Sequence, residues 1–92
     1  MDIERDPDGQ RYVASDDGRE VGELTFAQEA GTLRLLHTKV DEAAEGRGIG
    51  GGLARRALDD ARRDGLRVDP QCQFVAGWIE RHPEYAELVA ED

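Results

Sequence analysis

A chain of 92 residues is long enough for one small hydrophobic core, and we expect residues 1–92 to form a single domain. Hydrophobic residues make up 38% of the sequence and charged residues 36%, which is typical of a soluble globular protein. No apolar run approaches the roughly 20 residues that cross a membrane. The acidic segment 1–6 lacks the apolar stretch of a secretory signal, so we expect a cytoplasmic protein with no membrane partner.

The charged and metal-ligating residues exclude two further classes of partner. Cys72 is the one cysteine, and with only His37 and His82 beside it the sequence offers too few soft ligands for a structural zinc site, so we expect no metal. The net charge of −9 and the single lysine argue against nucleic acid, because phosphate backbones require a basic surface. The acidity either attracts a basic partner or reflects a salt-rich cytoplasm in which acidic surfaces keep proteins in solution.

The first half of the chain has strand character. Three segments, 10–15, 20–27 and 32–40, are separated by turn signals and predict a three-stranded antiparallel meander. Strict alternation in the third segment puts Leu33, Leu35 and His37 on one face. The same alternation puts the remaining residues on the other face: Arg34, Leu36, Thr38 and Val40.

The second half predicts two helices and a short strand. Apolar residues at helical spacing predict a helix over 49–64, with a stripe of Ile49, Leu53, Ala54, Ala57, Leu58 and Ala61. Segment 66–70 reads as a strand whose proline confines its pairing to a sheet edge or a strand end. A second helix over 74–81 stops before Pro83. The strand, helix, strand order is a βαβ unit, so the flanking strands run parallel. We therefore expect an α/β fold with a mixed, mostly antiparallel sheet and flanking helices.

A glycine-rich turn, Glu45-Gly46-Arg47-Gly48-Ile49-Gly50-Gly51, leads directly into the first helix. The first N–H groups of a helix have no intrahelical partner, and glycines let a diphosphate approach them. No Ser, Thr, Asp or Asn precedes Ile49 to cap these donors. The pattern is either an anion cradle or a helix start capped by glycine. Residues 45–67 carry 6 basic and 4 acidic side chains, and these arginines either face a polyphosphate or are solvated.

Three blocks of the chain resemble the GCN5-related N-acetyltransferases, and most closely the minimal members of that superfamily. The blocks are Leu36-His37-Thr38-Lys39-Val40, Gly46-Arg47-Gly48-Ile49-Gly50-Gly51, and Pro70-Gln71-Cys72-Gln73-Phe74-Val75 through Trp78-Ile79 to His82-Pro83-Glu84-Tyr85. The resemblance covers roughly 32–85 and implies a βαβ unit that binds acetyl-coenzyme A, the co-substrate. It implies direct transfer of the acetyl group to an amine. The implied coenzyme contacts come from Val40, Gly46, Arg47, Gly48, Ile49, Gly50 and Gly51.

Glu45 departs from the family pattern, which has Arg or Gln at the first place of the diphosphate loop. A carboxylate repels phosphate, and Arg47 is the expected compensating cation. Cys72 follows the parallel strand, at a position where close relatives also tend to have cysteine. It is either a proton donor or transient acyl carrier, or a small buried hydrophobe. His37 is either a general base or a hydrogen-bonded core residue. Tyr85 is expected to pack against Trp78.

Two functions besides acetyl transfer stay open at the level of sequence. One is a non-enzymatic module that binds coenzyme A or acyl-coenzyme A. The other is a ligand-free homodimeric interaction protein with Trp78 or Phe74 as an exposed anchor. The chain is expected to be a monomer or a homodimer. We expect so short a chain to leave the acceptor side of the coenzyme open, which would suit a protruding lysine or a polyamine.

Overall fold

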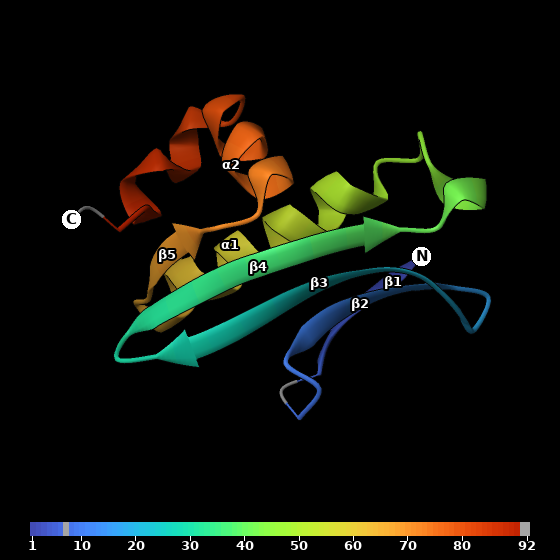
Figure 1. Cartoon of the computed structure of the whole chain (residues 1–92), viewed down its shortest axis with the longest axis horizontal. Helices are drawn as coiled ribbons and strands as arrows, with labels where there is room; N and C mark the ends of the chain where they lie inside the picture. Colours follow the sequence, from blue (N-terminus) through green and yellow to red (C-terminus); the bar gives the residue numbers. More distant parts are fainter. Residues whose placement is uncertain (7, 91–92) are drawn as a thin grey trace.

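The computed structural model describes residues 1–6 and 8–90, which form a five-stranded sheet backed by helices (Figure 1). The strands are β1 (Asp2–Asp6), β2 (Arg11–Asp16), β3 (Arg19–Glu29), β4 (Thr32–Val40) and β5 (Arg67–Pro70). The α-helices are α1 (Ile49–Asp64) and α2 (Gln73–Glu80), and two 3-10 helices are η1 (Glu42–Ala44) and η2 (Pro83–Leu88). In the described part of the chain, no helix has both the length and the apolar character needed to span a membrane.

The sheet has the strand order β1-β2-β3-β4-β5, with antiparallel pairing throughout except between β4 and β5. The mixed α/β fold and the parallel βαβ unit expected from the sequence are therefore confirmed. Pro70 ends the edge strand β5, as its missing N–H requires. Strand β1 was not predicted, because Asp2–Asp6 contains one apolar residue among charged ones. It pairs with β2 and makes the antiparallel part four-stranded.

A β-bulge in β4 overturns the predicted face of His37. Thr25 pairs with His37 whereas Phe26 pairs with Leu35, so Leu36 is the extra residue that has no partner on β3. The bulge shifts the alternation by one residue. Leu33 and Leu35 are buried before it and His37 is exposed after it. The expected row of Leu33, Leu35 and His37 is therefore wrong, and residues 38 and 40 take the inner face instead.

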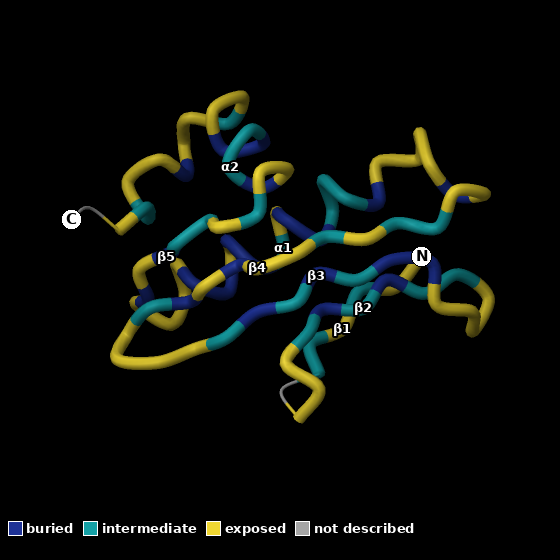
Figure 2. Tube along the Cα trace, in the orientation of Figure 1, coloured by how far each residue is buried: buried dark blue, intermediate teal, exposed yellow. Residues whose placement is uncertain are grey.

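Helix α1 covers the inner face of the sheet, and its predicted apolar stripe is buried as expected. Figure 1 shows α1 behind the sheet, and Figure 2 shows the buried residues gathered between these two layers. The helix lies close to β3, because an ideal β-carbon on Gly22 would stand 2.9 Å from Cγ2 of Ile49. Asp60 also faces this interface, where it is 3% exposed and accepts a 2.9 Å hydrogen bond from the Tyr12 hydroxyl.

Helix α2 and η2 pack beside α1 through aromatic side chains. The Trp78 ring stacks on His82 at 3.7 Å between centroids and lies 5.6 Å from the Tyr85 ring. The expected packing of Tyr85 against Trp78 is confirmed. Of the two candidate exposed anchors, Trp78 is only 6% exposed and is ruled out, whereas Phe74 is 42% exposed. The second helix ends at Glu80, and Pro83 begins η2.

Candidate functional site

The glycine turn presents backbone donors that no side chain caps. Gly48 is the N-cap of α1 with φ 75°, and Gly46 has φ 85°, both in the left-handed region that favours glycine. No side chain of the described residues caps this end of the helix. The Gly52 N–H donates to the Gly48 carbonyl, so the donors ahead of it lie at residues 49–51. The helix is 16 residues long, and its dipole adds partial positive charge at the same end.

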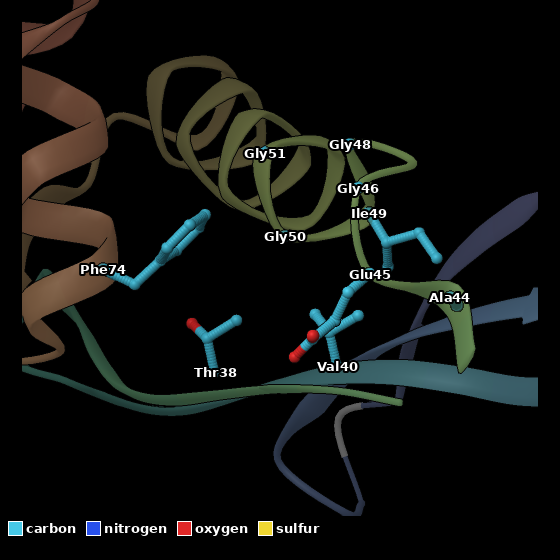
Figure 3. Close-up of a pocket in the computed structure, with 10 residues that line it drawn as sticks. All are labelled: Thr38, Val40, Ala44, Glu45, Gly46, Gly48, Ile49, Gly50, Gly51 and Phe74. Carbon is cyan, nitrogen blue, oxygen red and sulfur yellow. The ribbon is translucent and has the colours of Figure 1, made fainter. Parts of the chain in front are cut away.

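A cavity of about 370 Å³ opens against these donors, between β4, the glycine turn and α2 (Figure 3). It is lined by residues from these three places: Thr38, Val40, Ala44, Glu45, Gly46, Gly48, Ile49, Gly50, Gly51 and Phe74. Phe74 points from α2 toward the first turn of α1, and Glu45 extends from the turn toward β4 (Figure 3). The glycine side of the cavity therefore suits an anion, and the side formed by Val40, Ile49 and Phe74 suits an apolar chain.

Six of the seven residues that the resemblance implied for coenzyme binding line this cavity, and Arg47 is the exception. The Arg47 guanidinium instead bonds the Asp16 carboxylate at 2.7 Å. This hydrogen bond and charge hold the pKa of Asp16 below its usual value. Among the described residues that line the cavity, Glu45 is the one with a charged side chain. In this structure Arg47 therefore does not provide the expected offset to the negative charge of Glu45 at the cavity.

The other arginines of segment 45–67 are also engaged within the chain. Their contacts join α1 to β1 and η2, join β5 to the chain at η2, or lie within α1: Arg55 bonds Tyr85, Arg56 bonds Asp60 and the Ile3 carbonyl, Arg62 bonds Glu87 and the Glu84 carbonyl, Arg63 bonds Asp60 and Asp64, and Arg67 bonds the Glu87 and Val89 carbonyls. The positive charge of segment 45–67 is thus largely engaged by partners within the chain.

Cys72 lies just past the last paired residues of β4 and β5, and it contacts the cavity through Thr38. Its backbone N–H donates to the Leu35 carbonyl, and its Sγ lies 3.3 Å from Oγ1 of Thr38, which lines the cavity. Burial raises the pKa of the thiol, but hydrogen bonds from the Thr38 hydroxyl and from the Val75 and Phe74 backbone outweigh it and lower the pKa below the usual value. A thiol with a lowered pKa gives up its proton more readily.

His37 is not brought together with Cys72 and the glycine turn. It is exposed and is absent from the cavity lining, because the bulge at Leu36 turns it to the outer face of the sheet. The Thr25 hydroxyl donates to its backbone carbonyl at 3.3 Å. The structure therefore supports neither a core position for His37 nor a position at the cavity.

The cavity includes three residues that the sequence did not single out for binding: Thr38, Ala44 and Phe74. Thr38 was assigned to the wrong face because a bulge leaves no signal in strict alternation. Phe74 was considered as an apolar helix residue and as a candidate dimer anchor, although its place two residues after Cys72 predicts proximity to the same cavity. Ala44 is buried beside Glu45 in the short connection before the turn.

This fold belongs to a known family. Residues 11–88 match the family model described as GCN5-related N-acetyl-transferase. The chain therefore belongs to the GCN5-related N-acetyltransferase family, as the three sequence blocks indicated. The match includes β2 through η2 and so contains the entire cavity.

Individual proteins show how far the similarity extends. The chain is 33% identical over 60 residues to the protein NATD1 of Danio rerio, covering 63% of this chain and 54% of that protein. NATD1 of Bos taurus is 37% identical over 49 residues, with coverage of 53% and 43%. The chain thus spans about half the length of the curated relatives it matches.

Two solved structures show the similarity in three dimensions. A GCN5-like putative N-acetyltransferase from Staphylococcus aureus superposes with a TM-score of 0.76 at 19% identity, covering 99% of this chain and 89% of that one, which shows a shared fold. A GNAT family acetyltransferase from Brucella melitensis, determined in complex with acetyl-CoA, is 35% identical with a TM-score of 0.56. That comparison covers 62% of this chain and 41% of that one.

Proposed function

We propose that this chain binds acetyl-coenzyme A in the cavity beside the glycine turn and transfers the acetyl group to an amine. The observation that carries the proposal is the uncapped N-terminus of α1, whose glycines face a cavity of about 370 Å³. Membership of the family supports it. The acetyl-CoA complex of the Brucella melitensis relative supports the identity of the ligand.

The residues at the turn fit a diphosphate. An ideal β-carbon on Gly46 or Gly48 would meet no atom within 4 Å, so both glycines leave open space beside their backbone. Backbone N–H groups at residues 49–51 point out of the helix end and favour negative charge there. Val40, Ile49 and Phe74 line the rest of the cavity and suit the apolar parts of the pantetheine arm.

The reaction is direct transfer. The unprotonated amine nitrogen forms a bond to the thioester carbonyl carbon, the carbon–sulfur bond breaks, the amine gives a proton to water and the departing thiolate gains one. Cys72 supplies that proton, because its thiol lies one hydrogen bond from the cavity and its pKa is lowered. His37 takes no part in this proposal, since it lies on the outer face of the sheet.

The acceptor is a flexible cationic amine, either a protein lysine or a polyamine. The net charge of −9 attracts cations to the protein surface and raises their local concentration. Phe74, at the cavity, is 42% exposed and Leu36, at the bulge where β4 and β5 part, is 39% exposed. These two apolar side chains suit the methylene groups of a lysine or polyamine.

Calorimetry and an activity assay together test the proposal. We expect coenzyme A and acetyl-coenzyme A to bind with one site, and the amide NMR signals of residues 46–51 to shift on titration. Acetylation is then measured with a panel of lysine peptides and polyamines. Absence of binding would overturn the proposal and leave the ligand-free interaction protein, whereas binding without turnover on any acceptor would favour the non-enzymatic binding module.

A further inference from the structure

Two ion pairs join the turn between β2 and β3 to the segment that leads into α1. Asp16 accepts from Arg47 at 2.7 Å, and Arg19 donates to Asp41 at 3.1 Å. Each segment thus supplies one acid and one base to the other. A backbone hydrogen bond of 2.9 Å, from the Asp41 N–H to the Val21 carbonyl, also joins β3 to the start of the segment that leads into α1. Both segments lie at the same end of the molecule (Figure 1).

The segment 41–48 has little structure of its own to hold it. Its regular part is η1, which is three residues long, and Ala44 is its one buried residue among those described. Gly46 and Gly48 are both left-handed and have open space where a side chain would stand. Glycines lose more conformational freedom on ordering than other residues do, so such a turn is poorly ordered without external contacts.

We propose that Asp16 is a positioning residue for the glycine turn, which it orders through Arg47 so that the turn fits a diphosphate before the ligand arrives. The inference rests on the proposed coenzyme binding. A preordered turn binds more tightly because less freedom is lost on association. The charge of Asp16 acts in the opposite direction, since a carboxylate near an anion site weakens anion binding. The two effects therefore predict opposite changes in coenzyme A affinity when this carboxylate is removed.

Asp16→Asn and its matched control Asp17→Asn distinguish the ordering effect from the charge effect. Asp17 is the adjacent acidic residue, and its φ of 51° is one that asparagine readily adopts. We expect Asp16→Asn to weaken coenzyme A binding about two- to fivefold at low salt, the range for an exposed ion pair, and Asp17→Asn not to weaken it. Asp16→Glu, which keeps the carboxylate, should recover part of the loss.

Two further measurements identify positioning as the cause. Asp16→Asn should weaken binding less in an Arg47→Gln background than in the wild type, because the pair is already broken. In the ligand-free protein, Asp16→Asn should speed amide exchange in residues 43–48 while the melting temperature stays within about 2 °C, as a local effect requires.

The experiment distinguishes failure of this inference from failure of the proposed function. Binding by Asp16→Asn that is as tight as or tighter than binding by Asp17→Asn would overturn the inference and leave the proposed function intact. Failure of the wild-type protein to bind coenzyme A would overturn the proposed function, and the positioning role with it.

Discussion

The ring of Phe74 occupies the space that a β-carbon on Gly50 would need, since an ideal β-carbon there would stand 2.8 Å from Cζ of Phe74. The first turns of α1 and α2 meet at this contact, on one wall of the cavity (Figure 3). The absence of a side chain at position 50 therefore keeps the Phe74 ring against α1. It also keeps the ring out of the space that we assign to the coenzyme.

Gly50→Ala should weaken coenzyme A binding about tenfold, because the added methyl group pushes the Phe74 ring toward the cavity. Calorimetry measures the change. Gly77→Ala is the matched control in α2, because its β-carbon would meet only the Arg81 guanidinium, at an ordinary 3.6 Å. The double variant with Phe74→Ala should recover part of the affinity. No recovery would show that the ring is not the cause. Gly50→Glu should abolish binding outright, since it adds a carboxylate beside the diphosphate.

Glu45→Arg should tighten coenzyme A binding about two- to fivefold at low salt, because it replaces a repulsive charge in the cavity lining with an attractive one. The gain should shrink as salt is added. Glu42→Arg is the control, since Glu42 is an exposed residue of η1 and gives the same change in net charge outside the lining. Equal affinities for the two variants would show that only overall charge matters.

Cys72→Ala should lower kcat with an amine acceptor by about 10²-fold and leave the affinity for coenzyme A nearly unchanged, as expected of a proton donor in the transition state. Cys72→Ser distinguishes the two chemical roles of the thiol, because a hydroxyl still relays a proton but carries an acyl group poorly. Full activity of Cys72→Ala would return the thiol to a packing role.

Thr38→Val should raise the pKa of the Cys72 thiol. The Thr38 hydroxyl, 3.3 Å from the sulfur, stabilises the charged thiolate more than the neutral thiol. Alkylation of Cys72 by iodoacetamide, followed against pH, should therefore have its midpoint at higher pH and be slower at neutral pH. Thr25→Val is the control, because the Thr25 hydroxyl bonds the His37 carbonyl instead. An unshifted midpoint in Thr38→Val would contradict the assigned hydrogen bond.

Asp60→Ala should lower the free energy of unfolding by about 3 kcal/mol, because it leaves the buried Tyr12 hydroxyl without its acceptor and removes one of the two acceptors of Arg56. Tyr12→Phe should cost only about 1 kcal/mol, since it removes the hydroxyl itself. Burial and the hydrogen bond to Asp60 raise the pKa of Tyr12. Urea unfolding measures both changes, with the exposed Glu80→Ala as control. Equal losses in the two variants would contradict the proposed network.

Local features of the sequence determined the framework of this protein. The apolar stripe of α1, the glycine turn ahead of it and Pro70 at the end of β5 each act through neighbouring residues, by helical periodicity, by a missing cap and by a missing N–H. These signals lie in residues close together in the sequence, so they predicted the βαβ unit and the location of the candidate anion site.

Contacts between distant residues decided the rest. The bulge at Leu36 depends on the register between β3 and β4, and it alone moves His37 outward and Thr38 to the cavity. Arg47 resembles a phosphate ligand in the sequence, but folding brings it to Asp16, 31 positions away. In the sequence Asp60 is one polar residue of a helix, and only folding brings it against Tyr12, 48 positions away. Such partners are selected by packing in three dimensions, which local periodicity does not encode.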